Sequence, residues 1–201
     1  GVLPWYDAGF VTGATVAEQL RTFGGKLFRL DEHLARLQHS LEIVGVEPDP
    51  ALSEFPFLAA ELVARNYPLL PPGSDLGLCI FVTPGPYAAM TLGAEFRPTV
   101  AMHTYLLPFG FWADKYESGQ ALASCDVVQP SPRSWPPELK CRSRVHYHLA
   151  DRQAAARFPG ARALLTDEAG HVTETSTANL LVLRGDVLIS PPRERILPGI
   201  S

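Results

Sequence analysis

Apolar residues near the start of the chain follow a pattern that predicts a β-hairpin. Thr15–Phe23 is typical of one strand and Lys26–Leu30 of a second strand. Gly24 and Gly25 stand between them, and because glycine accepts positive φ angles, the pair suits a tight turn. We therefore expect the chain to reverse direction at these two residues.

Two amphipathic helices are expected next, because apolar residues there recur at helical spacing. The first is expected to have Asp31 as its cap and to stop at Gly45, and the second to run from about Ala51 to Asn66. The residues expected to face the core are Leu34, Leu37, Leu41 and Val44 in the first helix and Leu52, Phe55, Ala59, Leu62 and Val63 in the second.

Proline-rich bends separate the remaining elements. A helix is predicted over His146–Arg157, with Leu149, Ala150 and Ala154 on its buried side and its end at Phe158-Pro159-Gly160. Strands are predicted at Leu76–Thr83, Thr99–Leu107, Ala121–Gln129, Ala161–Thr166, His171–Thr173, Asn179–Leu183 and Val187–Ser190. This order of elements indicates the α+β class.

The same order predicts two domains. Residues 1–110 are expected to form a small α+β N-terminal domain, residues 111–118 a connector, and residues 119–201 a second domain. The connector is placed where glycine, proline, aromatic and charged residues mix without periodicity, as is common between domains.

Composition and charge limit the kinds of partner that the chain is expected to bind. Its 201 residues are 46% hydrophobic and 19% charged, with a formal charge of −4, which indicates neither disorder nor a basic surface for nucleic acid. No apolar run is long enough to span a membrane, and Cys79, Cys125 and Cys141 form no C-x-x-C pair. We therefore expect a cytoplasmic protein with small-molecule partners, further copies of itself, and no metal site.

Lysine chemistry singles out one position. Of the three lysines, Lys26 lies beside the predicted turn and Lys115 in the predicted connector, where a solvated surface role is expected. Lys140 stands between a proline-rich loop and a helix in an apolar stretch, where burial could lower the pKa of an amine and suit it to covalent chemistry with a carbonyl group.

Two further stretches carry polar groups. Val172–Leu180 places Glu174 and four hydroxyls between two strands, which is either a polar turn or the wall of a cofactor site. Leu197–Ser201 could open a helix whose backbone N–H groups receive a phosphate. Arg133, Arg142 and Arg144 could each meet a substrate carboxylate or face water, and the sequence does not choose between these alternatives.

The order of several short motifs resembles the class IV aminotransferases, the group of branched-chain aminotransferases, D-amino acid aminotransferases and aminodeoxychorismate lyases. The first half carries Asp7-x-Gly9, Gly13-x-x-x-x-Glu18-x-x-Arg21 and Phe28-Arg29-Leu30-Asp31-Glu32-His33-Leu34-x-Arg36-Leu37. The second half carries Leu139-Lys140, Val172-Thr173-Glu174 with Asn179-Leu180, Ser190-Pro191-Pro192 and Leu197-Pro198-Gly199-Ile200-Ser201. The resemblance covers essentially the whole chain.

The resemblance implies a homodimeric, two-domain enzyme of fold type IV that uses pyridoxal 5′-phosphate, with residues 119–201 as an incomplete cofactor-binding domain. Lys140 would hold the cofactor covalently and move the substrate proton, and Glu174 would hold a proton on the ring nitrogen. The other cofactor contacts implied are Arg36, Ile200 and Ser201 at the phosphate, Leu197 under the ring, and Ser176 and Thr177 at its edge.

Three functions remain open at this stage. They are transfer of an amino group from an amino acid to a 2-oxo acid, cleavage of aminodeoxychorismate to 4-aminobenzoate and pyruvate, and a non-catalytic scaffold. Branched-chain enzymes carry Asn-Tyr where this chain has Arg144-Val145, and Ala17 replaces the usual aromatic residue before Glu18. Because family members continue for several tens of residues after the Leu197–Ser201 turn, we expect the chain to be a fragment, truncated at its C-terminus.

Overall fold

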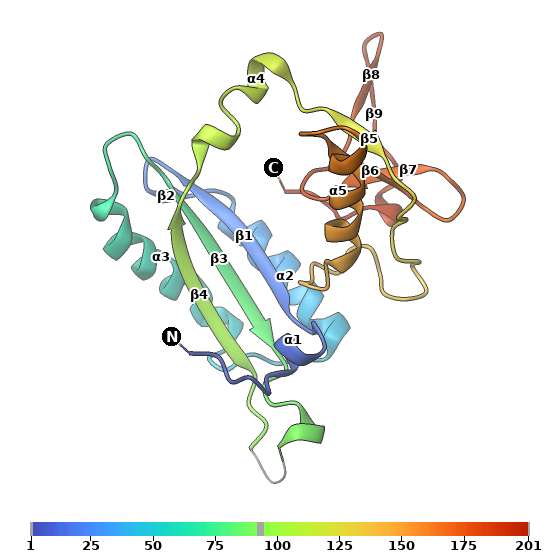
Figure 1. Ribbon diagram of the computed structural model, residues 1–201. Coiled ribbons are helices and arrows are strands. Elements are labelled where there is room, and N and C mark those ends of the chain that lie inside the picture. The colour runs from blue at the N-terminus through green and yellow to red at the C-terminus, as the bar shows by residue number, and fades with distance from the viewer. Residues whose placement is uncertain (1, 92–94, 201) are drawn as a thin grey trace. The chain divides into compact units, whose positions relative to one another are not determined.

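The computed structural model describes residues 2–91 and 95–200, and these form two compact units (Figure 1). The first unit holds the described residues up to Pro108, together with Lys140–Ser143 and Ile200. The second unit holds Phe109–Leu139 and Arg144–Gly199, so the stretch predicted as a connector lies within it. The division into domains at residues 111–118 stays a prediction.

The first unit is built on an antiparallel sheet with the strand order β2-β1-β3-β4. Its strands are β1 (Val16–Phe23), β2 (Lys26–Leu27), β3 (Leu76–Thr83) and β4 (Thr99–Leu106). The central pairing sets Glu18 of β1 opposite Ile80 of β3, and Ile80 opposite Met102 of β4. Because side chains alternate along a strand, these three residues share one face of the sheet.

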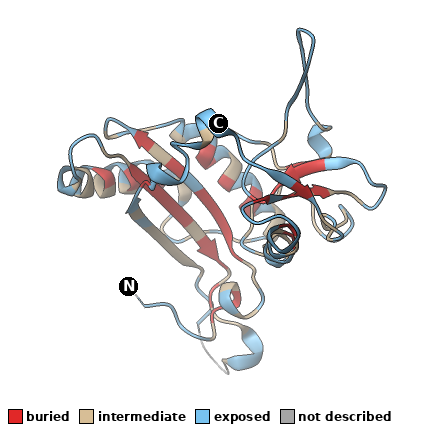
Figure 2. Ribbon diagram, turned by 45° about the horizontal axis from the view of Figure 1, so that its top comes forward, coloured by how far each residue is buried: buried red, intermediate tan, exposed pale blue. Residues whose placement is uncertain are grey.

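Two helices, α2 (Leu30–Val44) and α3 (Phe55–Asn66), cover that face of the sheet (Figure 1). Leu37 of α2 and Phe55 of α3 are fully buried against it. Figure 2 shows the buried residues concentrated along β1 and β3. At about 25 cal/mol per Å² of apolar surface removed from water, this core is the main stabilising contribution within the unit.

A short helix, α1 (Ala8–Val11), explains the Asp7-x-Gly9 motif. The Asp7 carboxylate accepts hydrogen bonds from the backbone N–H of Gly9 at 2.7 Å, from Thr83 at 2.9 Å and from Thr99 at 2.7 Å. A Cβ at Gly9 would lie 2.4 Å from the Thr83 methyl group, so a larger residue cannot occupy this position without displacing β3 or α1.

The second unit pairs a three-stranded sheet with one helix. Strand β5 (Leu122–Ser124) runs parallel to β6 (Arg162–Thr166), which is antiparallel to β7 (Val172–Thr175). Helix α5 (Val145–Arg157) packs on this sheet through small residues, which allow a close approach. The buried cluster consists of Ala123, Ala150, Ala154, Ala161, Ala163 and Leu165.

A two-stranded hairpin, β8 (Val182–Arg184) and β9 (Val187–Ile189), completes the second unit. The remaining elements are α4 (Lys115–Ser118) and the 3₁₀ turns Leu52–Glu54, Tyr67–Leu69, Ala88–Met90, Phe109–Phe111 and Arg193–Arg195. Within residues 2–91 and 95–200, no helix combines the length and apolar character needed to cross a membrane.

Several predicted elements are confirmed in position. Strand β3 has the predicted bounds, and Gly24 and Gly25 turn the hairpin with φ angles of 57° and 78°. Gly45 ends α2 in the left-handed region with a φ of 67°. Helix α5 differs from its prediction only by starting one residue earlier, at Val145.

Other predictions were wrong in detail. Strand β2 stops at Leu27 rather than Leu30, because Arg29 adopts a left-handed conformation with a φ of 52° and starts α2. Asp31 therefore lies in the first turn of α2 and does not cap it. Leu149 was predicted to be buried, yet 46% of it is exposed.

Most of the strands predicted for the second half are shorter than expected, but β7 extends two residues past its predicted end at Thr173, and the strand predicted at Asn179–Leu183 lies at Val182–Arg184. Strand β5 ends at Ser124, and two residues later the backbone N–H of Asp126 donates to the side chain of Gln153 in α5 at 2.7 Å and not to a neighbouring strand. Between Leu197 and Ile200 the described chain forms no helix, and Ser201 lies outside the described residues.

Candidate functional site

Lys140 belongs to an extended segment that is added to the edge of β1 in the first unit. The Lys140 carbonyl accepts the N–H of Ala17 at 3.0 Å, and the N–H of Arg142 donates to the Thr15 carbonyl at 2.7 Å. The backbone N–H of Lys140 also donates to the hydroxyl of Ser40 at 3.2 Å. These bonds fix the base of the Lys140 side chain against β1 and α2.

The approach of this segment explains a second motif glycine. Gly13 has a φ of 74°, and its carbonyl accepts the Ser143 hydroxyl at 2.9 Å. A Cβ at Gly13 would lie 2.6 Å from the Ser143 oxygen. Glycine is therefore needed both for the backbone conformation and for the close contact with the lysine segment.

A buried charge cluster lies between β1 and α2. The Glu18 carboxylate is inaccessible to solvent and accepts two hydrogen bonds of 2.7 Å from the Arg36 guanidinium. Nδ1 of His33 lies 2.7 Å from the same carboxylate. Burial alone would raise the pKa of Glu18, but the hydrogen bonds from Arg36 and His33 outweigh it and hold that pKa below its usual value.

Arg36 was predicted to contact a cofactor phosphate, and in the structure its guanidinium binds Glu18. Its fork geometry, with two parallel hydrogen bonds to one carboxylate, is the geometry that also suits a phosphate. Its predicted role in phosphate binding stays a prediction, which rests on the resemblance.

Glu174 is the centre of a hydrogen-bond network in the second unit. One carboxylate oxygen accepts the Tyr147 hydroxyl at 2.6 Å and the Gln129 amide at 2.7 Å. The other accepts the Asn179 amide at 3.2 Å and the backbone N–H of Leu197 at 3.3 Å. Four donors thus satisfy a buried carboxyl group, so Glu174 does not lie in an exposed polar turn.

The other residues predicted around the cofactor take different positions. Ser176 is buried and its hydroxyl donates to Asp151 at 2.7 Å, whereas Thr177 is exposed. Leu197 is half-buried and lies beside Glu174 through its backbone, and the Ile200 carbonyl accepts a hydrogen bond from Arg29. The roles predicted for these four residues stay predictions.

Several polar residues of the second unit were not singled out from the sequence. Tyr147 and Gln129 hold Glu174, and Asp151 accepts the backbone N–H of Ala163 at 2.9 Å as well as the Ser176 hydroxyl. Burial would raise the pKa of Asp151, but these two hydrogen bonds lower it overall. In the sequence, Asp151 was visible only as a carboxylate inside a predicted helix, and no pattern pointed to Tyr147 or Gln129 as functional residues.

His146 is a further polar residue in an apolar setting. Burial, and then the nearby Arg144 guanidinium, lower its pKa to about 4, so the imidazole is neutral at pH 7. Its Nδ1 atom is buried and has no hydrogen-bond partner within the described chain. The ring lies 4.0 Å from the Tyr147 ring, centroid to centroid, and so packs beside the residue that holds Glu174.

We expect Tyr147→Phe to lower the free energy of unfolding by about 1–2 kcal/mol at neutral pH, because it removes one donor from a buried carboxylate. Burial, and then the Glu174 charge, raise the pKa of Tyr147. A raised folded-state pKa stabilises the fold below the unfolded pKa of about 10, and this contribution is lost as the pH rises through the folded value. Urea denaturation between neutral and alkaline pH measures both effects.

Tyr116→Phe is the matched control, since Tyr116 is 90% exposed. It should leave the free energy of unfolding and its alkaline decline unchanged. Equal losses in the two variants would contradict a role for the Tyr147 hydroxyl in holding Glu174.

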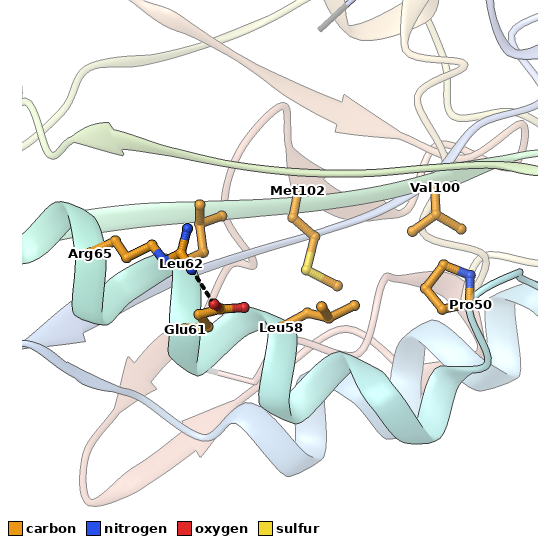
Figure 3. A pocket seen from close by; sticks show the side chains of 7 residues that line it. All are labelled: Pro50, Leu58, Glu61, Leu62, Arg65, Val100 and Met102. Atoms are coloured by element: carbon orange, nitrogen blue, oxygen red, sulfur yellow. Dashed lines mark hydrogen bonds and ion pairs between the residues drawn. The ribbon is translucent and has the colours of Figure 1, made fainter.

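A cavity of about 320 Å³ lies elsewhere, between α3 and β4 (Figure 3). Leu58 and Leu62 of α3 and Val100 and Met102 of β4 line it, and the Glu61–Arg65 ion pair lies at α3 beside it. None of the residues predicted to bind the cofactor lines this cavity, so it is not the predicted cofactor site.

Comparison with known proteins decides the family. The model of the family described as amino-transferase class IV matches residues 15–201. The chain belongs to this family. The resemblance inferred from the motifs is thereby confirmed, and the class IV aminotransferase family is one that uses pyridoxal phosphate.

Individual class IV relatives agree with the family match. The D-alanine aminotransferase of Bacillus licheniformis is 28% identical over 97% of this chain. The chain spans 65% of the length of that relative. A branched-chain-amino-acid aminotransferase-like protein of Arabidopsis thaliana is 22% identical over 98% of the chain, which spans 34% of its length.

Solved structures confirm the predicted α+β fold of type IV. The branched-chain amino acid aminotransferase of Escherichia coli has a TM-score of 0.87 at 19% identity, covering 100% of this chain and 66% of that one. A hypothetical aminotransferase from Mycobacterium tuberculosis, in its pyridoxal-phosphate-bound form, has a TM-score of 0.84 at 20% identity, covering 99% of this chain and 69% of that one. At sequence identities of 19% and 20%, these similarities establish the fold of this class IV aminotransferase family member and not its substrate.

Proposed function

We propose that this protein is a pyridoxal-phosphate-dependent aminotransferase that moves an amino group from an amino acid of branched-chain or D-amino acid type to a 2-oxo acid. The observation that carries the proposal is the placement of Lys140, whose backbone is fixed by hydrogen bonds to Ala17 and Ser40. The names of the D-alanine and branched-chain relatives support the substrate class. We also propose a homodimer as the active form.

The residues present fit this cofactor. Glu174 is a buried carboxylate held by four donors, and a carboxylate in that state suits a protonated ring nitrogen. Lys140 is an amine on a fixed backbone, which suits covalent attachment to an aldehyde. When bound, pyridoxal phosphate supplies an electron sink that stabilises negative charge at the substrate Cα.

Each of these side chains would then have one task. The Lys140 amine would hold the cofactor covalently and would take the proton from the substrate Cα. The Glu174 carboxylate would keep a proton on the ring nitrogen, and its donors Tyr147 and Gln129 would keep the carboxylate in place. The phosphate would be held by Arg36, Ile200 and Ser201, as the family resemblance implies.

A half-reaction tests the proposal. Purified protein is loaded with pyridoxal phosphate and mixed with single L- and D-amino acids without any 2-oxo acid, while absorbance is recorded and the product acid is assayed. We expect at least one amino acid to convert the bound cofactor to its amine form and to release one equivalent of its own 2-oxo acid. Adding a second 2-oxo acid should restore the starting spectrum.

Two other results would contradict the proposal. Release of pyruvate and 4-aminobenzoate from aminodeoxychorismate, with no cofactor conversion by any amino acid, would assign the lyase activity instead. Protein that never develops a cofactor spectrum would leave a scaffold that retains only the fold. Sedimentation analysis of the loaded protein tests the homodimer, and a strictly monomeric active species would contradict it.

A further inference from the structure

The sheet of the first unit has a second face, opposite α2 and α3. Alternation along the strands places Gln19 of β1, Cys79 of β3 and His103 of β4 side by side on this face, because they are direct partners in the register. Tyr105 lies on the same face, with its ring crossing Gly77: a Cβ built at Gly77 would lie 2.2 Å from that ring. We call this surface the open face.

Arg142 reaches onto the open face from the lysine segment. One guanidinium nitrogen lies 2.9 Å from the sulfur of Cys79, which is fully buried, while Arg142 itself is exposed. The backbone N–H of Arg142 is fixed by the Thr15 carbonyl. The guanidinium therefore has a defined position over the centre of the sheet.

Arg142 differs from the arginines of this chain that are paired with carboxylates. Ion pairs with carboxylates hold Arg21, Arg29, Arg36, Arg65, Arg97, Arg157, Arg162 and Arg195. Within the residues that the structure describes, Arg142 contacts a thiol and no carboxylate. A positioned guanidinium whose charge is not balanced by a neighbouring carboxylate is suited to bind an anion.

Two other side chains that can donate hydrogen bonds lie on the open face. One is the hydroxyl of Tyr105. Burial, and then Cys79, raise the pKa of Tyr105 above its usual value, although the charge of Arg142 partly opposes this shift. His103 lies next to Tyr105, with the two ring centroids 6.1 Å apart. A phenol and an imidazole can both donate hydrogen bonds, so the open face carries three kinds of donor group.

Arg142 and Lys140 lie on the same side of their segment. Cys141 is the bridge partner of Val16, which faces α2, so the residues on either side of Cys141 face the opposite way. Two positions along an extended chain span about 6.6 Å. An α-amino acid whose amino group is at the Lys140 amine therefore has its carboxylate within reach of a long arginine side chain.

We propose that Arg142, seated on Cys79, binds the carboxylate of the amino donor, and that the donor is therefore an amino acid and not a simple amine. This inference rests on the proposed function. It concerns residues of the first unit alone, and it makes Arg142 a determinant of substrate specificity.

The test compares Arg142→Gln and Arg142→Lys with the wild type. Arg97→Gln serves as the control, because Arg97 is an exposed arginine that pairs with Glu95 and precedes β4 in the sequence. Binding of 4-methylpentanoate, a carboxylate without an amino group, is measured by calorimetry with and without cofactor. The loaded protein is also mixed with leucine of either hand and with 3-methylbutylamine. Thermal melting checks that each variant is folded.

We expect Arg142→Gln to weaken 4-methylpentanoate binding about 10- to 100-fold, the loss of one charge-assisted hydrogen-bonded contact, and Arg142→Lys to weaken it less. The reaction of leucine should slow by a similar factor, whereas that of the amine should change less than about twofold. Arg97→Gln should behave as the wild type.

Wild-type affinity for 4-methylpentanoate in a folded Arg142→Gln variant would overturn the inference, and if that variant does not fold, wild-type affinity in Arg142→Lys would overturn it. Equal slowing of leucine and of 3-methylbutylamine would also overturn it, because a purely structural role affects both. A wild type that binds 4-methylpentanoate through Arg142 but never reacts with an amino acid would refute the proposed function and leave the carboxylate site standing.

Discussion

Replacing Lys140 with alanine is expected to abolish the absorbance change that pyridoxal phosphate produces on this protein, and to abolish amino-group transfer with it. The amine is the only group at this position able to bond to the cofactor aldehyde, and alanine offers none. The backbone bonds of Lys140 to Ala17 and Ser40 do not involve the side chain, so the variant should fold. Absorbance titration and a melting curve measure the two outcomes.

The chain provides its own matched controls for this substitution. Lys26 lies in β2 beside the hairpin turn, and Lys115 pairs with Asp114 on α4. Lys26→Ala and Lys115→Ala should leave the cofactor spectrum unchanged. A spectrum that survives in Lys140→Ala and disappears in one of the controls would move the attachment site to another lysine and refute the assignment.

The second large effect is on stability: Glu18→Gln is expected to lower the free energy of unfolding by about 3–5 kcal/mol, the typical cost of removing one partner from a buried ion pair. The substitution leaves the Arg36 guanidinium and His33 buried against a neutral amide. Urea denaturation followed by circular dichroism measures the loss. Glu32→Gln is the control, since Glu32 pairs with Arg29 at the exposed surface and should change stability little.

The pH dependence of stability gives the same prediction an independent check. The pKa of Glu18 is held below its usual value by Arg36 and His33 despite burial, so the folded state prefers the ionised carboxylate. Its contribution is fully present above the unfolded pKa of about 4.3 and is lost as the pH falls through the lower folded value. The wild type should therefore lose stability in acid more steeply than Glu18→Gln, and parallel acid curves would contradict this account.

Local chemistry explains which parts of the fold could be predicted. Gly24, Gly25 and Gly45 adopt the positive φ angles that their positions required, and the continuous apolar run of β3 marked a central strand. Arg29 shows the limit of such reasoning. A left-handed arginine contradicts its intrinsic preference, so the local sequence did not indicate that Arg29 precedes the first turn of α2, and the start of that helix was misplaced.

The sequence singled out several residues of the candidate site, but it did not indicate which side chains contact them in the fold. Lys140 stood out because of its apolar surroundings, and Glu174 because of the hydroxyls around it. The pairing of Arg36 with Glu18 depends on a strand and a helix meeting, and the contact of Arg142 with Cys79 depends on a segment 63 positions away. Hydrophobic periodicity and composition describe residues that are close together in the sequence. Contacts between residues 18 or 63 positions apart can therefore be identified only from the folded structure.

The attachment of the lysine segment to β1 has a consequence for how the protein is made. The Ser143 hydroxyl and the Gly13 carbonyl, 130 positions apart in the chain, meet in one hydrogen bond. During synthesis the sheet of the first unit can form from residues up to Pro108, but the lysine segment arrives only after about 35 more residues have left the ribosome, a delay of a few seconds at typical elongation rates. Until then the edge of β1 beside Val16 is unpaired. At this stage a nascent chain is most able to pair, through this edge, with a strand of another chain.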